Sequence, residues 1–305
     1  MMNKKEREQW LRERKTYIGG SDIGCILGLS KYKTALDVYL DKIGDTIEES
    51  TSEAAHWGNM LEDVVAKEYA SRTGLEVTES EGLIRHKKHP FIAANIDRWV
   101  DGKKHVLECK TANFMKGKEW GEQVTDQIPE LYLCQVAYYA AICDVEKVDI
   151  AVLIGGQEFR MYSYKRNKEF EDKLIRVAVN FWNNYVVKMI APNASNLGDV
   201  GTLYPKSNGL EIEANSDVAI KIESLKNLMG QSKHLGKEME SLQCEIKKFM
   251  QDNEVLIDQG GQVKATWRNG SPRSRLDSKK LASEHKAIYQ QYLTEGKAAR
   301  TFLIK

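Results

Sequence analysis

The sequence predicts an α/β or α+β fold, and three observations support this prediction. Amphipathic helical segments alternate with short apolar strands up to about residue 190, as in domains where helices pack on a sheet. Prolines, asparagines, serines and glycines then gather between residues 191 and 215, which indicates a connector. Residues 216–305 begin with one long helical stripe and continue with short strands. We therefore expect a core over residues 1–190, a connector over residues 191–215 and an accessory module over residues 216–305.

Composition excludes several classes of protein. The chain has 305 residues, of which 42% are hydrophobic and only 5 are prolines, which is typical of a soluble globular protein. No apolar run approaches the roughly 20 residues needed to span a bilayer, and the first fifteen residues lack the apolar segment of a signal peptide. The five cysteines, at positions 25, 109, 134, 143 and 244, form neither a zinc pattern nor a disulfide framework. We expect reduced thiols in a cytoplasmic protein.

The N-terminal segment predicts two short helices separated by a turn. Residues 3–15 alternate charged residues with Trp10 and Leu11, and residues 17–22, YIGGSD, form a turn before a second helix. Ser21 or Asp22 is the expected N-cap of that helix. A helix N-terminus presents free N–H groups to a phosphate, and Ser21 with Arg14 could complete such a site. Capping alone would also explain Ser21.

Two further helices precede the first strands. Residues 34–43 predict one, and residues 56–73 predict an amphipathic helix that ends at Gly74. We expect Glu62 to face inward because it shares the helical spacing of Val65, Ala66 and Tyr69. A buried carboxylate needs a partner, and a metal ion, Lys110 or an arginine would each serve. The expected apolar line of this helix contains Trp57, Leu61, Val64, Val65 and Tyr69.

The central stretch, FIAANIDRWVDGKKHVLECKT at residues 91–111, predicts two strands joined by a tight turn at Asp101-Gly102. Glu108 and Lys110 lie two residues apart and therefore share one face of the second strand. If the loop is residues 101–104, Asp97 lies opposite Glu108, and directly paired Cβ atoms are roughly 4.5–5.5 Å apart. One divalent cation could then take a carboxylate from each strand. A surface hairpin with a Glu–Lys pair would show the same pattern.

The remaining elements of the core surround this hairpin. Short extended pieces at residues 75–77 and 82–85 precede it, and a polar loop or short helix at residues 113–127 follows it. Residues 130–142, ELYLCQVAYYAAI, predict a helix that is apolar on nearly all sides and therefore buried. Its central polar residue is Gln135, which needs a hydrogen-bond partner, so we expect it to face the site. Strands at residues 148–154 and 159–164 and a helix at residues 168–188 close the core.

The accessory module begins with a long helix over residues 217–253, or a helical pair broken near Gly230 or Gly236. Its stripe is typical of a packing or self-association face and contains Ile222, Leu225, Leu228, Leu235, Met239, Leu242, Ile246 and Phe249. We expect strands at residues 255–257, 263–267 and 301–304, and a helix at residues 278–292. The net charge is only +1, but residues 264–305 are rich in Lys and Arg. This bias indicates a polyanion contact or, more commonly, a solvated basic face.

These residues resemble, in order, the motifs of the PD-(D/E)XK nuclease superfamily over roughly residues 12–164. The closer resemblance is to its YqaJ-like viral recombinase and phage lambda exonuclease-type branch. The matching positions are Arg14 seven residues before Ser21, Gly58 four before Glu62, Asp97 followed by Glu108-x-Lys110, and Gln135 four before Tyr139. The proline of the superfamily name is absent before Asp97.

The resemblance implies a restriction-endonuclease-like core with a central mixed sheet flanked by helices. It also implies a deoxyribonuclease that depends on Mg²⁺ or Mn²⁺, acting as a 5′-to-3′ exonuclease on double-stranded DNA ends. Asp97, Glu108 and the Cys109 carbonyl would hold a metal ion, and Glu62 would complete a second site. Lys110 would orient or help deprotonate the attacking water, and Gln135 would position Lys110 or the scissile phosphate. Arg14 and Ser21 would contact the 5′ phosphate.

The expected partners follow from the same resemblance. They are double-stranded DNA ends, further copies of the chain and a single-strand annealing protein of the RecT type, in a bacterial host cell and of phage or prophage origin. Two other functions stay open at this point. One is a sequence-nonspecific endonuclease, and the other is a non-catalytic scaffold that holds DNA ends or docks the annealing protein. The intact set of two acids and a lysine argues against the scaffold.

Overall fold

The computed structural model describes residues 4–44, 52–296 and 299–305. The chain divides into two compact units, residues 1–203 and residues 204–305, and each is described by itself. Within the described ranges, no helix has both the length and the apolar character needed to cross a membrane.

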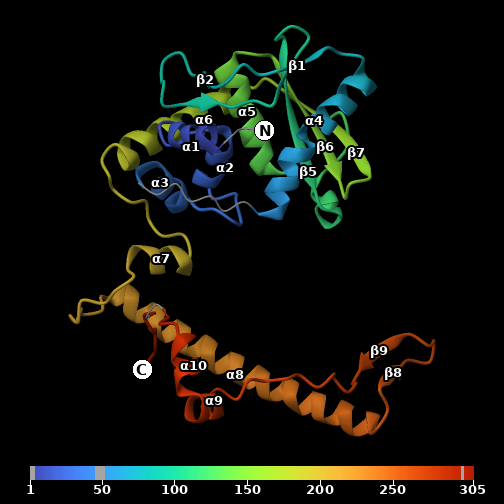
Figure 1. The fold of residues 1–305 in the computed structure, drawn as a ribbon, viewed down its shortest axis with the longest axis vertical. Helices are drawn as coiled ribbons and strands as arrows, with labels where there is room; N and C mark the ends of the chain where they lie inside the picture. The colour runs from blue at the N-terminus through green and yellow to red at the C-terminus, as the bar shows by residue number, and fades with distance from the viewer. Residues whose placement is uncertain (1–3, 45–51, 297–298) are drawn as a thin grey trace. The chain divides into compact units, whose positions relative to one another are not determined.

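The first unit is built around a five-stranded mixed sheet with strand order β1-β4-β5-β6-β7 (Figure 1). Neighbouring strands are antiparallel except β5 and β6, which run parallel. A parallel pair needs a crossover connection, and helix α5 (Glu130–Cys143) supplies it. The five strands are β1 (Val77–Glu79), β4 (Arg98–Val100), β5 (His105–Ala112), β6 (Lys147–Ile154) and β7 (Glu158–Lys165). The predicted central mixed sheet flanked by helices is confirmed.

Helices cover both faces of this sheet, as Figure 1 shows for α4 and α5. The main core lies on the α5 side, where Tyr138 and Val106 are fully buried. A smaller cluster on the other side packs α4 against Leu107 and Cys109. Successive strand residues point to opposite faces, so Glu108 and Lys110 point to the α5 side. The helices of this unit are α1 (Lys4–Arg14), α2 (Gly20–Ile26), α3 (Ala35–Ile43), α4 (Glu53–Thr73), α5, α6 (Lys168–Phe181) and α7 (Leu197–Leu203).

Shorter elements complete the first unit. Strands β2 (Ile84–Arg85) and β3 (Ala93–Ala94) form a separate two-stranded sheet, and Ile18 pairs with Ile92 in an isolated parallel bridge. A 3₁₀ helix, η1 (Phe114–Glu119), follows β5. A π-helical turn, η2 (Trp182–Val186), extends α6, so this helical segment ends close to the predicted position.

The structure corrects two expectations about helices in the first unit. Helix α2 begins at Gly20 with Gly19 as its N-cap, so neither Ser21 nor Asp22 is the cap; Asp22 instead accepts a hydrogen bond from the Gly19 N–H at 3.1 Å. In α4, Trp57 and Val64 are 54% and 52% exposed. With 3.6 residues per turn, both lie about a third of a turn or more away from the buried Tyr69, so they do not belong to the inward face.

The described part of the second unit contains one long helix, a hairpin and two short helices. Helix α8 (Ser216–Met250) is continuous through Gly230 and Gly236, which decides between the two predicted arrangements. Strands β8 (Val255–Ile257) and β9 (Val263–Thr266) pair antiparallel. Helices α9 (Ser278–Glu284) and α10 (Lys286–Gln291) replace the single helix predicted at residues 278–292. The strand predicted at residues 301–304 is wrong, because that segment pairs with no strand in the described part of the chain.

Candidate active site

The β4–β5 hairpin brings two carboxylates to facing positions. Arg98 pairs with Leu107 and Val100 pairs with His105, so the loop is residues 101–104 and the same register places Asp97 opposite Glu108. Asp101, Gly102 and Lys103 all adopt positive φ, at 51°, 64° and 70°, and the chain reverses direction through these three residues. The register predicted from the sequence is therefore confirmed.

Asp97 lies just before β4 and is fixed by the backbone of β5. Its Oδ2 accepts a hydrogen bond from the Cys109 N–H at 2.7 Å. Burial and the nearby charge of Glu108 raise the pKa of Asp97 to about 7. Two carboxylates this close repel one another, and a cation between them would relieve that repulsion.

Glu108 has one satisfied and one unsatisfied carboxylate oxygen. The residue is only 2% exposed. Its Oε1 accepts hydrogen bonds from Gln135 Nε2 at 2.6 Å and from Lys110 Nζ at 2.5 Å. Its Oε2 is the one buried side-chain oxygen or nitrogen that lacks a hydrogen-bond partner among the residues the structure describes. A buried acceptor without a partner is costly, so this oxygen marks the place where a cation fits.

Gln135 connects the hairpin to helix α5, as the sequence predicts for a polar residue inside a buried helix. Besides Glu108, its amide donates to the Tyr139 hydroxyl at 2.9 Å. The Tyr139 hydroxyl in turn donates to the Asn95 carbonyl at 3.0 Å, two residues before Asp97. This network holds both sides of the hairpin in place. The sequence could not predict the contact with the Asn95 carbonyl, because every residue type has a backbone carbonyl.

Lys110 points to the same side of β5 as Glu108 and retains 21% side-chain exposure. Its ammonium lies 5.2 Å from the centre of the Tyr132 ring. Burial opposes the charged form, but Glu108 and Asp97 outweigh it, and the pKa of Lys110 lies above its usual value. Lys110 therefore carries a positive charge beside the two acids at neutral pH.

Glu62 pairs with an arginine, which is one of the alternatives that the sequence leaves open. Its Oε1 accepts a hydrogen bond from Arg98 Nη1 at 2.6 Å, and Arg98 also donates to the Asp97 carbonyl at 2.7 Å. Burial and the charge of Asp97 raise the pKa of Glu62, although the contact with Arg98 opposes this rise. A metal-binding role for Glu62 stays a prediction. Arg98 was missed because nothing in the hairpin pattern distinguishes it from a surface residue.

Arg14 and Ser21 lie together at the surface. Arg14 Nη2 donates to Ser21 Oγ at 3.5 Å, and the Arg14 guanidinium lies 4.8 Å from the Trp10 ring centre. Ser21 is exposed in the first turn of α2. The predicted pair is thus brought together beside the N-terminus of a helix, where an anion is stabilised.

The start of α2 also lies directly against helix α5, which carries Gln135. A Cβ atom placed on Gly20 would come within 2.4 Å of the Tyr139 ring and 3.1 Å of Gln135 Cγ. Only glycine permits this approach. Beneath the turn, the buried Asp22 accepts a hydrogen bond from Lys42 at 2.7 Å. Lys42 was missed by sequence reasoning, because its partner lies twenty residues away on another helix.

The donor set fits a hard divalent cation. No group of three His, Cys, Asp or Glu side chains suited to a metal ion occurs in the described part of the chain, so Asp97 and Glu108 would be the side-chain ligands. Mg²⁺ is often held by one or two carboxylates together with waters and substrate phosphates. Burial raises the pKa of the Cys109 thiol, and this side chain packs on the α4 side. Cys109 could therefore contribute only its carbonyl.

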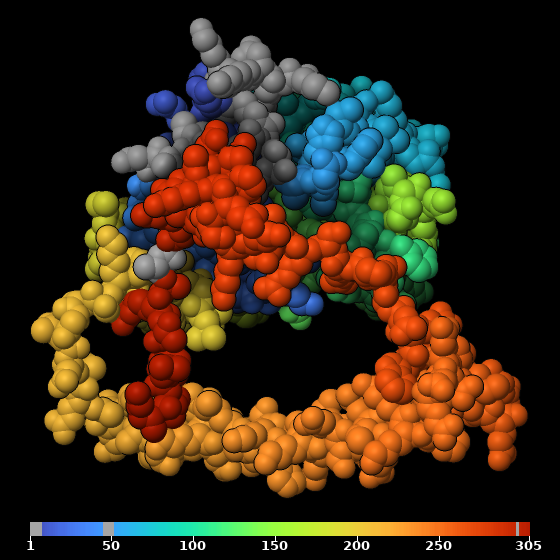
Figure 2. All heavy atoms as spheres, turned by 60° about the horizontal axis from the view of Figure 1, so that its bottom comes forward, coloured from blue at the N-terminus to red at the C-terminus, as the bar shows by residue number. Residues whose placement is uncertain are grey.

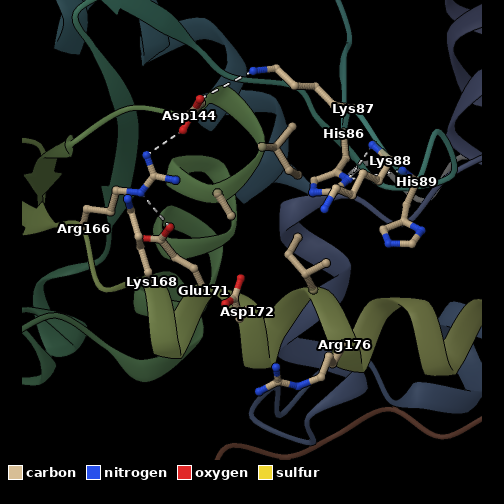
Figure 3. Close-up of a pocket in the computed structure, with 13 residues that line it drawn as sticks. His86, Lys87, Lys88, His89, Asp144, Arg166, Lys168, Glu171, Asp172 and Arg176 are labelled. Carbon is tan, nitrogen blue, oxygen red and sulfur yellow. Dashed lines mark hydrogen bonds and ion pairs between the residues drawn. The ribbon is translucent and has the colours of Figure 1, made fainter.

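A separate pocket lies away from these residues. It has a volume of about 470 Å³ and lies among the loop at residues 86–89, the end of α5 and helix α6 (Figure 3). Its basic lining is partly neutralised, because Arg166 pairs with Asp144 at 2.7 Å and with Glu171 at 3.1 Å. None of the predicted site residues lines it, so it is not the candidate active site.

Comparison with known proteins decides the family. The model of the YqaJ-like viral recombinase domain matches residues 9–146. The uncharacterized protein YqaJ of Bacillus subtilis (strain 168) is 36% identical over 298 residues, which cover 95% of this chain and 91% of that protein. The chain belongs to the YqaJ-like viral recombinase family. Membership of this family supports a phage-type nuclease, which is a hydrolase that acts on DNA.

More distant similarities accompany this match. The uncharacterized protein R354 of Acanthamoeba polyphaga mimivirus is 26% identical over 152 residues, covering 47% of this chain and 28% of that protein. The alkaline exonuclease LHK-Exo from Laribacter hongkongensis is similar in structure with a TM-score of 0.48 at 16% identity, covering 60% of this chain and 94% of that chain. A phage-related exonuclease from Haemophilus somnus 129PT gives a TM-score of 0.44 at 17% identity, covering 57% and 96%.

Proposed function

We propose that this member of the family is a metal-dependent deoxyribonuclease that digests double-stranded DNA from its ends in the 5′-to-3′ direction. The observation that carries the proposal is the buried Oε2 of Glu108, which has no hydrogen-bond partner among the described residues and lies beside Asp97 and the charged Lys110. Two acids that need a cation and a lysine that stays charged form an arrangement suited to a phosphodiester.

Mg²⁺ or Mn²⁺ bound by Asp97 and Glu108 would supply Lewis-acid polarisation of the phosphate and a more acidic bound water. The protein residues have separate tasks. The raised pKa of Lys110 favours a role in stabilising the negative charge that develops on the phosphate over a role as a proton acceptor. Gln135 fixes the orientation of Glu108 through its hydrogen bond to Oε1. It acts as a positioning residue.

Arg14 and Ser21 would hold the 5′ phosphate of a DNA end. A guanidinium binds phosphate oxygens through charge-assisted hydrogen bonds, and the hydroxyl of Ser21 lies within reach of it. The N-terminus of α2 lies against Tyr139 and Gln135 through Gly20, so the end contact and the acids belong to one packed structure. Contacts to phosphate carry no sequence information, and we therefore propose digestion that is independent of sequence. Self-assembly and a RecT-type annealing partner belong to the same proposal.

The decisive experiment compares end-labelled linear duplex DNA with closed circular DNA, in Mg²⁺, Mn²⁺ or EDTA. We expect metal-dependent loss of the linear DNA from its 5′ ends alone, and no loss with Glu108→Ala. Glu119→Ala is a matched control, because this carboxylate lies on the exposed η1 segment and pairs with Lys116. Cutting of the circle would show an endonuclease instead. DNA binding without cleavage under any metal would show a scaffold and overturn the proposal.

A further inference from the structure

Helix α8 carries a regular apolar seam along its whole length. Its residues recur with alternating steps of three and four, which is the heptad repeat of a coiled coil. The first heptad positions are Val218, Leu225, Ser232, Met239 and Ile246, and the fourth positions are Lys221, Leu228, Leu235, Leu242 and Phe249. Eight of these ten residues are apolar. The 35-residue helix thus presents one continuous stripe over five heptads.

The structure leaves this seam open. The exposure of its apolar members ranges from 38% at Leu225 to 76% at Phe249. In Figure 2, α8 is the long yellow-to-orange rod, and most of the face shown is not covered by other segments of the second unit. Soluble proteins rarely expose an apolar patch of this size unless a partner covers it.

The spacing of the seam indicates what covers it. A stripe that repeats every 3.5 residues stays in register only with another helix of the same repeat, as the two supercoil. Every further copy of this chain offers such a helix. About sixteen apolar side chains from two copies, at roughly 100 Å² each, would remove about 1,600 Å² from water, which is the area that a stable dimer typically buries.

The flanking positions permit a helix to pair with its own copy. The residues on one flank are all uncharged, namely Ile222, Met229, Gly236, Gln243 and Met250. The other flank begins with Asp217, continues with the neutral Ser224 and Gln231, and carries Glu238 and Glu245 in its second half. An apolar seam beside acidic residues does not suit a nucleic acid, which is bound by positive charge.

Lys221 decides the direction of pairing. In a parallel pair it would face Lys221 of the second copy across the seam, which places like charges together. In an antiparallel pair, first positions face fourth positions. Lys221 then lies opposite Ile246 of the second copy and next to its Glu245. The same alignment sets Met229 beside Gly236 of the second copy, a large side chain against a small one.

We propose that α8 pairs with α8 of a second copy of this chain in an antiparallel coiled coil. The seam of α8 is then the contact surface for the self-assembly proposed above. This pairing does not depend on nuclease activity. Leu225 packs against Leu242 of the second copy, and Leu228 packs against its Met239. The first units of the two chains are joined through their second units.

The first test measures the mass of the full-length chain by sedimentation equilibrium, without DNA or metal, so that the outcome does not depend on catalysis. We expect Leu235→Glu with Leu242→Glu to halve the mass and raise the dissociation constant at least 100-fold. The matched control, Ile220→Glu with Asn227→Glu, adds the same charge to the same helix outside the seam and leaves the mass unchanged. Circular dichroism checks that both variants keep their helix.

Three outcomes would overturn the pairing. The first is an unmodified chain that stays monomeric at a chain concentration about 10 times the dissociation constant of a micromolar dimer. The other two are an unchanged mass in the seam variant and an equal loss of mass in the control variant. A disulfide test checks the direction, in a Cys244→Ser background. Leu225→Cys with Leu242→Cys should give a covalent dimer, because these residues are about 25 Å apart within one helix and can meet only between copies. A covalent dimer of Leu225→Cys alone would show a parallel pair and reject the antiparallel arrangement, because the antiparallel alignment places the two copies of this residue about 25 Å apart.

Discussion

Gln135 Nε2 donates a hydrogen bond to Glu108 Oε1 at 2.6 Å, and this contact joins the buried helix α5 to the central hairpin. It occupies one oxygen of the carboxylate and leaves Oε2 without a partner among the described residues. The amide therefore sets which oxygen is free to receive a cation. Residues that orient a metal ligand in this way affect activity without touching the substrate.

The first prediction concerns this orienting contact. Gln135→Leu keeps the size of the side chain but removes the donor to Glu108 and Tyr139, so we expect a 10–100-fold loss of activity and a higher Mg²⁺ requirement. A Mg²⁺ titration of DNA digestion measures both. The control Gln123→Leu, on an exposed loop, should behave as the unmodified protein. An unchanged Mg²⁺ requirement in Gln135→Leu would show that Gln135 does not position Glu108.

The second prediction concerns the charge of Lys110. Lys110→Ala removes the ammonium beside the acids, and we expect turnover to fall by about 10²–10⁴-fold while metal binding remains. Single-turnover digestion and Mn²⁺ binding separate the two effects. Lys104→Ala, at the exposed hairpin turn, is the matched control. A near-normal rate in Lys110→Ala would remove this residue from the mechanism.

The hairpin shows how much of the candidate site local sequence patterns can predict. The turn at residues 101–102 and the alternation of strand residues are enough to predict the register, and with it the facing positions of Asp97 and Glu108. The same patterns could not choose a partner for Glu62. Its pairing with Arg98 depends on how α4 packs on the sheet, and the choice among a metal, Lys110 and an arginine is a tertiary one.

The sequence also failed to predict the first residue of α2 and the buried face of α4. The sequence did not predict that α2 begins at Gly20. Asp22 looks like an N-cap residue, but its side chain lies inside the helix and accepts a hydrogen bond from the Gly19 N–H. On α4, apolar residues occur around much of the circumference, so the pattern of apolar residues placed Trp57 and Val64 on the buried face. The residues of this helix that are buried are those that contact the sheet. The pattern of apolar and polar residues alone does not specify that contact.

The third prediction concerns the DNA end. Arg14→Ala should slow digestion of 5′-phosphorylated ends by about 10-fold or more, which corresponds to the loss of a charge-assisted hydrogen bond, and should have little effect on 5′-hydroxyl ends. Rates on matched duplexes with the two kinds of end measure the difference. Arg12→Ala, exposed on the same helix, is the control. An equal loss on both ends would reject a phosphate contact at Arg14.

The fourth prediction concerns the close packing of α2 on α5. A Cβ at position 20 meets the Tyr139 ring at 2.4 Å, so we expect Gly20→Ala to destabilise the protein by about 1–3 kcal/mol and to weaken the preference for 5′ phosphate. Urea unfolding measures the first effect. Gly201→Ala in helix α7 is the control, since a Cβ added there would meet no described atom within 4 Å beyond its chain neighbours and its own helix backbone. That substitution should be neutral or slightly stabilising.

The last prediction concerns stability in acid. Burial opposes ionisation of Asp22, but Lys42 and Lys33 outweigh it, and the pKa of Asp22 falls from 3.8 to about 2. Because the pKa is lower in the folded protein, the ionised group stabilises the fold above about pH 4, and this contribution of about 2 kcal/mol is lost as the pH falls toward 2.

Asp22→Asn should remove that part of the pH dependence and also destabilise the protein at pH 7, because Lys42 is left buried without its carboxylate. Urea unfolding between pH 2 and pH 7 compares it with Glu169→Gln, which breaks an exposed pair with Lys173 and should change stability by less than about 1 kcal/mol. If Asp22→Asn kept the acid dependence of the unmodified protein between pH 4 and pH 2, the stabilisation would have to come from other carboxylates.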